Sequence, residues 1–226
     1  YNIVKSGAVA VNVKGISNVS IYNNTLYTDR TTTETWRGLI RVYTNTDITP
    51  HSVAHGTKIF NNIFYTKNQT ISIQISDEEC LKDFESDYNV FYCENGSPIF
   101  DYCGSIKTFE QWQALGYDTH SIVINPDFKD FVNFVPTKRL DYGTNLGTNW
   151  IEGLATNAKW GTTSPETALQ NGHWQVGAII YKEVATTAPV PVYSGSVIND
   201  ATPARLEMTY SLTLANIVPA ASSFNV

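Results

Sequence analysis

Short runs of alternating apolar and polar residues recur along the first hundred residues of the chain. Two of these runs are nearly identical: VSIYNNTLYT at 19–28 and TKIFNNIFYT at 57–66. Each follows a more aliphatic run, and the pattern is repeated a third time in weaker form. The aliphatic runs are 8–13, 38–43 and 70–75, and the third polar copy is FESDYNVFY at 84–92. Alternation with a period of two predicts strands, and its repetition predicts a stack of similar coils.

The alternation also assigns each side chain to one face of its strand. We expect the aliphatic runs to turn one column of side chains into the core, which contains Val11, Ile40 and Ile73. A second core column is expected from the polar copies, in which Leu26, Phe64 and Phe91 occupy equal places. Tyr27, Tyr65 and Tyr92 form a third column beside it.

The central Asn pair of the repeat is unexpected, because Asn is disfavoured in strands. Asn24, Asn62 and Asn89 fall at equal places in the three copies. A stacked coil must bend between its sheets, and Asn both tolerates the left-handed conformation and satisfies exposed backbone groups there. Copies about 4.8 Å apart can also hydrogen-bond to one another. We therefore interpret these residues as a structural ladder and not as catalytic groups.

The repeat unit SNVSIYNNTLY at 17–27 resembles that of the right-handed parallel β-helix of the pectate-lyase-like superfamily. The resemblance covers residues 1–100 and implies an all-β fold that contains the last three coils of such a helix. It further implies a bacterial protein, secreted or held at the cell surface, that binds or cleaves an acidic polysaccharide. Tyr1 begins within the pattern, so we expect further coils before it.

The remaining sequence suggests a cap, a linker and the start of another module. The stretch TFEQWQALG at 108–116 predicts a short helix, with a capping box formed by Thr108 and Gln111. Residues 101–184 are similar to the closing segment of secreted bacterial β-helix proteins, in which a helix and extended pieces cover the last coil. Residues 185–192 form a Pro-containing linker. Residues 193–226 predict two strands around DATP and are similar to the opening of a bacterial immunoglobulin-like β-sandwich, so further domains are expected.

Composition narrows the choice of partners. The net charge is −6 and 16% of the residues are charged, a balance that argues against a nucleic-acid partner and against anionic membranes. No apolar run is long enough to insert into a membrane. Aromatic residues make up 12% of the chain, which fits either a β core or rings that stack on sugars. Of the three cysteines, Cys93 and Cys103 flank a Gly-Ser-Pro turn. This spacing neither requires nor excludes a disulfide between them.

Two basic residues are candidates for catalysis by β-elimination, which needs a base and a cation to stabilise the developing negative charge. Arg41 lies mid-strand on the polar face of the aliphatic runs and can clamp a uronate carboxylate. Lys58 occupies an outward position in the same column as Glu85. The simpler interpretations are a solvated Arg41 and a surface ion pair between Lys58 and Glu85. The residues expected to bind substrate near Arg41 are Asn12, Trp36, Arg37, Tyr43 and Gln74.

The sequence predicts no metal site. His51 and His55 have the spacing of a helical metal-binding pair, but Pro50 and Gly56 argue against a helix there. The acidic stretch at 77–87 could hold Ca²⁺, yet it lacks the glycine spacing of a calcium loop and is more simply a solvated turn. Ca²⁺ is therefore the one cofactor that the sequence leaves open.

Two functions remain open at this stage. One is a polysaccharide lyase or glycoside hydrolase, and the other is a non-catalytic adhesin or surface scaffold that binds the polysaccharide. The sequence holds terminal coils and shows no pair of groove carboxylates at matched positions. We therefore expect the main active site, if there is one, to lie upstream of this segment.

Overall fold

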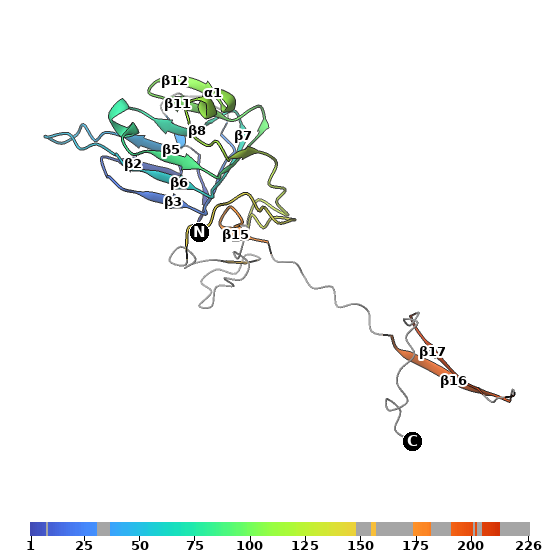
Figure 1. The fold of residues 1–226 in the computed structure, drawn as a ribbon. Helices are drawn as coiled ribbons and strands as arrows, with labels where there is room; N and C mark the ends of the chain where they lie inside the picture. The colour runs from blue at the N-terminus through green and yellow to red at the C-terminus, as the bar shows by residue number, and fades with distance from the viewer. Residues whose placement is uncertain are drawn as a thin grey trace. The chain divides into compact units, whose positions relative to one another are not determined.

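The computed structural model describes residues 1–7, 9–30, 37–147, 155–156, 174–181, 191–200, 202 and 205–212. They belong to two compact units, Tyr1–Glu183 and Val184–Val226. Strands dominate both units, which confirms the predicted all-β class (Figure 1). Within the described ranges, no helix has the length and apolar character needed to cross a membrane.

The first unit is a parallel β-solenoid with three sheets. Sheet A contains β1 (Ile3–Lys5), β4 (Thr25–Thr28), β7 (Ile63–Asn68), β10 (Val90–Asn95) and β13 (Ile122–Val123). Sheet B contains β2 (Val11–Lys14), β5 (Gly38–Tyr43), β8 (Ile71–Ile75), β11 (Ile99–Tyr102) and the antiparallel β12 (Ser105–Thr108). Sheet C contains β3 (Ser20–Tyr22), β6 (Lys58–Phe60) and β9 (Glu85–Asp87). The chain passes repeatedly from B to C to A, so the predicted stack of coils is confirmed.

The register of the strands confirms the two predicted core columns. Val11 pairs with Ile40 and Ile40 with Ile73 in sheet B, whereas Leu26, Phe64 and Phe91 pair in sheet A. The rings of Phe64 and Phe91 stack with their centroids 4.7 Å apart. Each fully buried side chain of this kind contributes about 1.5–3 kcal/mol. Burial of the apolar side chains in these two columns therefore stabilises the solenoid.

The predicted Asn ladder is present at the bend between sheets C and A. The backbone N–H and side-chain amide of Asn24 both donate to Oδ1 of Asn62, at 2.9 and 3.0 Å. Asn62 donates in the same way to Oδ1 of Asn89, at 2.9 and 3.2 Å. Asn2, which the sequence analysis did not include, adds a further step by donating twice to Asn24. The ladder satisfies buried backbone groups that the bend would otherwise leave without partners.

A different set of residues adopts the left-handed conformation at this bend. The first Asn of each pair does so, with φ of 49° at Asn23 and 58° at Asn61. Tyr88 takes the same place in the third coil, with φ of 55°. The left-handed backbone and the ladder, both expected at one Asn, are divided between two neighbouring residues in the structure.

A short helix closes the C-terminal end of the solenoid. Helix α1 (Phe109–Ala114) carries the predicted capping box of Thr108 and Gln111. Its Trp112 is fully buried and stacks on Phe100, with ring centroids 5.0 Å apart. The helix thus covers the last coil with an aromatic side chain. A single 3-10 turn, η1 (Glu78–Leu81), lies earlier in the chain, just before β9.

The extended segments after the helix lie along the outer face of sheet A. Leu140 and Val176 pack against Ile63 and Val90 of that face. The outward residues of sheet A are largely apolar, so they need cover as much as the end of the solenoid does. The sequence analysis placed these segments over the last coil, and the structure places them beside sheet A. Two short strands, β14 (Ala155–Thr156) and β15 (Ile179–Ile180), pair in this region.

The cysteines form no disulfide. Cys93 lies on β10 in sheet A, whereas Cys103 follows β11 in sheet B. Both are free, as is the buried Cys80. The disulfide between Cys93 and Cys103 that the spacing left open is therefore not formed.

The second unit contains a hairpin of β16 (Tyr193–Asn199) and β17 (Arg205–Tyr210). These are the two strands predicted around DATP. Ile198 and Leu206 face each other in the register, and their side chains are 77% and 61% exposed. Residues 213–226 and most of the predicted linker lie outside the described residues, so the rest of the β-sandwich stays a prediction.

Candidate functional site

The outward face of sheet C is built from short strands with identical alternation. The middle residues, Ile21, Ile59 and Ser86, point into the solenoid and are buried. The flanking residues form two rows across the sheet. The first row, which we call the charged row, is Ser20, Lys58 and Glu85. The second row, which we call the aromatic row after its first two members, is Tyr22, Phe60 and Asp87.

Two hollows lie on this face. One has a volume of about 250 Å³ and is lined by Ser20, Ile21, Tyr22, Lys58, Phe60, Glu85 and Leu146. The other has a volume of about 260 Å³ and is lined by Phe60, Phe84, Glu85, Ser86, Asp87, Gly116 and Tyr117. Since Phe60 and Glu85 line both, the hollows are neighbours on this face, and we call the two together the sheet C groove.

The charged row contains an exposed ion pair. Lys58 Nζ donates to Glu85 Oε1 at 2.6 Å, and the two side chains are 49% and 51% exposed. This is the surface pair that the sequence analysis considered as the simpler role of Lys58. Such a pair contributes at most about 1 kcal/mol to stability. Glu85 lines both hollows, and within the described part of the chain no protein group donates to its Oε2, so this atom is available as an acceptor.

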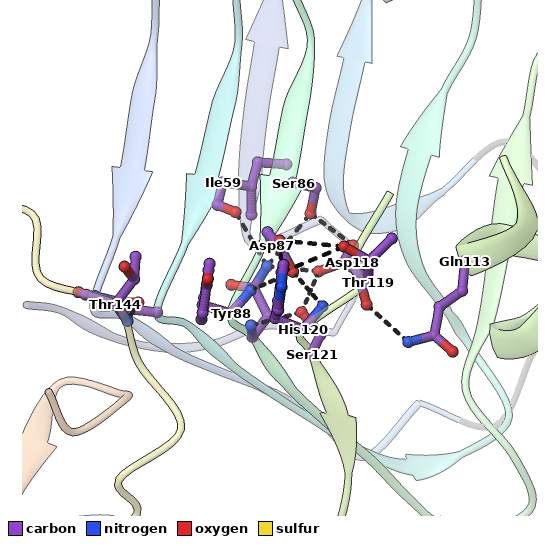
Figure 2. Close-up of polar contacts among 12 residues, drawn as sticks. Ile59, Ser86, Asp87, Tyr88, Gln113, Asp118, Thr119, His120, Ser121 and Thr144 are labelled. Atoms are coloured by element: carbon purple, nitrogen blue, oxygen red, sulfur yellow. Dashed lines mark hydrogen bonds and ion pairs between the residues drawn. The ribbon is translucent and has the colours of Figure 1, made fainter. Parts of the chain in front are cut away.

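The aromatic row ends at an oriented histidine (Figure 2). His120 Nδ1 lies 2.7 Å from Asp87 Oδ2, and the backbone N–H of His120 donates to Asp87 Oδ1 at 2.7 Å. The imidazole stacks on Tyr88 with centroids 4.7 Å apart and an interplanar angle of 2°. His120 is nevertheless 61% exposed. The ring is thus fixed by its surroundings while its other nitrogen remains open to solvent.

Behind this surface, Asp118 is the buried centre of a hydrogen-bond network (Figure 2). Its Oδ2 accepts from Ser86 Oγ at 2.7 Å and from Trp112 Nε1 at 2.8 Å. Its Oδ1 accepts from Asn89 Nδ2 at 2.8 Å and from Ser121 Oγ at 2.6 Å. Burial raises the pKa of Asp118 above its ordinary value, and these four hydrogen bonds oppose that shift. Asp118 therefore joins sheet C, the Asn ladder and the cap, and its role is structural.

The predicted groove on sheet B is partly assembled. Asn12, Arg41 and Gln74 lie in one row across the sheet, as expected. The Arg41 guanidinium packs 4.0 Å from the Tyr43 ring, and Asn12 Nδ2 donates to the Tyr43 hydroxyl at 3.3 Å. Gln74 is only 4% exposed and donates to Asp101 Oδ2 at 2.9 Å, so it is buried beneath this face. The substrate-binding roles of these residues stay predictions.

The two candidate catalytic residues do not share a sheet. Arg41 lies on β5 in sheet B and Lys58 on β6 in sheet C. Arg37 precedes β5 and is partly buried, and Trp36 lies outside the described residues. The structure therefore brings Arg41, Asn12 and Tyr43 together and separates Lys58 from them.

Three carboxylates of the acidic stretch at 77–87 contact other protein groups. Asp77 Oδ2 accepts the backbone N–H of Thr44 at 2.9 Å, while Glu85 and Asp87 engage Lys58 and His120. Among the residues that the structure describes, no group of three or more His, Cys, Asp or Glu side chains is arranged to hold a metal ion.

Sequence reasoning did not single out Tyr22, Phe60 or His120 as site residues. For the first two a signal existed, because both occupy the position just before the Asn pair. For His120 no local signal existed, since its partner Asp87 is 33 residues away and the contact depends on the cap.

A scan of protein-family models, a search of curated proteins and a search of solved structures each gave no match. The function must therefore be argued from the residues of this chain.

Proposed function

We propose that the sheet C groove binds a polysaccharide, with Phe60 as its central platform. The observation that carries the proposal is a pair of neighbouring hollows that share Phe60 of the aromatic row and Glu85 of the exposed ion pair. Phe60 lies between Tyr22 and Asp87 in the register, and the Lys58–Glu85 pair lies beside it. Tyr1 extends the aromatic surface, with its ring 6.1 Å from that of Tyr22.

This combination matches the two surfaces of a sugar ring. The C–H groups of a pyranose are apolar and pack on an aromatic face, while its hydroxyls need polar partners. Binding sites of this kind are concave and largely apolar, with a few polar groups that fix the orientation of the ligand. Charged partners make the stronger hydrogen bonds. In the sheet C groove, Phe60 supplies the apolar platform, and Lys58 and Glu85 supply a donor and an acceptor.

The geometry supports recognition better than cleavage. Glycoside hydrolysis requires two carboxyl groups of which one is held protonated as the acid. In the sheet C groove, both carboxyl groups are already engaged by basic side chains, Glu85 by Lys58 at 2.6 Å and Asp87 by His120 at 2.7 Å. We therefore favour a non-catalytic binding protein, such as an adhesin or surface scaffold that is exported to meet extracellular polysaccharide. β-Elimination by Arg41 or Lys58 stays a prediction for a longer protein.

A binding assay with single variants tests the proposal. Affinity electrophoresis against a panel of polysaccharides should show retardation of the wild type by at least one polymer. Phe60→Ala should weaken that affinity about tenfold or more, as expected for a central aromatic contact. Phe131→Ala is the control, because Phe131 is 41% exposed and packs near Tyr27 of sheet A, outside the groove.

A third variant compares the two candidate faces. Tyr43→Ala alters the predicted groove on sheet B and leaves the sheet C groove intact. Full loss of binding in Tyr43→Ala, with unchanged binding in Phe60→Ala, would contradict the proposal and favour sheet B.

A further inference from the structure

We infer that the sheet C groove selects uncharged polysaccharides over acidic ones. The inference rests on the proposed function, because it names the class of ligand for the same groove. It also departs from the acidic substrate that the sequence resemblance implies. Its basis is the charge and hydrogen-bonding capacity of the side chains that line the groove.

The groove has no net positive charge. Of the side chains that line it, Lys58 is basic and Glu85 and Asp87 are acidic. Glu85 contacts Lys58 at 2.6 Å, and Asp87 contacts His120, which lies beside the groove, at 2.7 Å. The balance is neutral if the imidazole is charged and negative if it is not. The whole chain adds a net charge of −6, which gives a long-range field that repels anions. A polyuronate would therefore approach the groove against the electrostatic potential.

The ion pair beside Phe60 also offers a donor, Lys58, next to an acceptor, Glu85, and a sugar hydroxyl can use both. A hydroxyl donates one hydrogen bond and accepts others, so it can accept a hydrogen bond from Lys58 and donate one to Glu85 Oε2. An ionised carboxylate can only accept. A uronate carboxylate that accepted from another N–H of Lys58 would bring its negative charge close to that of Glu85, and the two charges would repel each other. Neutral hydroxyls leave the existing 2.6 Å ion pair intact.

Glu85 is the residue that should enforce this preference. It lines both hollows and is half exposed, so its charge lies where a ligand on Phe60 would sit. Glu85→Gln removes that charge and keeps an oxygen that can accept from Lys58. The substitution therefore separates charge repulsion from the shape and packing of the groove.

The test uses isothermal titration of the wild type, Glu85→Gln and Phe60→Ala with four polymers. The neutral probes are hydroxyethylcellulose and galactomannan, and the acidic probes are polygalacturonate and alginate. We expect the wild type to bind a neutral polymer at least about tenfold more tightly than either polyuronate, a difference of about 1.4 kcal/mol. Raising NaCl from about 0.05 to 0.5 M should leave the neutral affinity unchanged and should not weaken binding of the polyuronates. Glu85→Gln should bind the polyuronates more tightly than the wild type does, so the difference in affinity between neutral and acidic polymers should become smaller.

The outcomes separate this inference from the proposed function. If a polyuronate binds most tightly, with an affinity that falls with salt and is lost in Phe60→Ala, the groove is a binding site but its ligand class is wrong. If no polymer responds to Phe60→Ala, the proposed function fails and the inference fails with it. A neutral preference that Glu85→Gln leaves unchanged would overturn the assigned role of Glu85.

Discussion

At the scale of single residues, the Asn pair shows how two identical neighbours can have different roles. Asn23 and Asn61 adopt the left-handed conformation and point their side chains outward, toward the segment beside sheet A. Asn24 and Asn62 point inward and form the ladder. The sequence alone cannot show this division, because both positions carry the same residue in both copies.

Removal of one ladder residue should be costly. Asn62→Ala deletes the acceptor for both donors of Asn24 and the amide donor to the carbonyls of Ile21 and Phe60. Because these groups are buried, we expect the free energy of unfolding to fall by about 2–4 kcal/mol. Asn95→Ala is a matched control, since Asn95 is exposed and should change stability by less than about 0.5 kcal/mol. Urea denaturation of both variants measures the difference, and equal effects would show that the ladder is not a source of stability.

The buried carboxyl of Asp118 predicts a pH dependence with a definite sign. Burial raises the pKa of Asp118, so the folded state binds its proton more tightly than the unfolded state does. The resulting stabilisation is fully present below the ordinary aspartate pKa of about 4 and is lost as pH rises through the elevated value. The free energy of unfolding of the wild type minus that of Asp118→Asn should therefore decrease as pH rises from about 4 to 7.

This difference can be measured by urea denaturation of both proteins at several pH values, since other carboxyl groups contribute equally to both. An increase with pH would contradict the expectation. It would mean that the four hydrogen bonds to Asp118 outweigh its desolvation and hold its pKa below the ordinary value.

At the scale of elements, the solenoid and the segments beside sheet A are joined by specific side chains. Asn61 Nδ2 donates to the Thr144 carbonyl at 2.8 Å, and Asn61 Oδ1 accepts the Thr144 N–H at 2.8 Å. Asn23 makes a similar contact to the carbonyl of Gln175. Tyr88, at the same place in the third coil, stacks on His120 instead. The outward residue at each bend thus determines which segment is bound there.

Asn61→Gly should release one of these segments without disturbing the bend. Glycine adopts the left-handed conformation freely, so the bend is kept while the two hydrogen bonds to Thr144 and the 3.3 Å hydrogen bond to Asn23 Oδ1 are lost. We expect faster amide hydrogen exchange in residues 140–147 and unchanged exchange in strands β6 and β7. Asn18→Gly is the matched control, since Asn18 also has a left-handed φ of 60° and is exposed. Unchanged exchange in residues 140–147 would show that apolar packing alone holds this segment.

At the scale of the whole molecule, periodic features were predictable and non-periodic ones were not. The strands, the core columns, the ladder and the row of Asn12, Arg41 and Gln74 all follow from repeated alternation in the sequence. The burial of Gln74, the separation of Arg41 from Lys58 and the contact of Asp87 with His120 depend on how the coils close around one another. Such contacts join distant residues and leave no local pattern. The surface pair of Lys58 and Glu85 was predictable from their shared column, whereas the neighbouring aromatic residues Tyr22 and Phe60 were not singled out.

The most direct test of the central claim is hydrogen exchange with and without a saturating neutral oligosaccharide. The account predicts protection on binding in the strands of sheet C, at residues 20–22, 58–60 and 85–87, and in the adjoining residues 117–120. Exchange in residues 11–14 and 38–43 of sheet B should stay unchanged. Protection confined to sheet B, with no change in sheet C, would contradict the account.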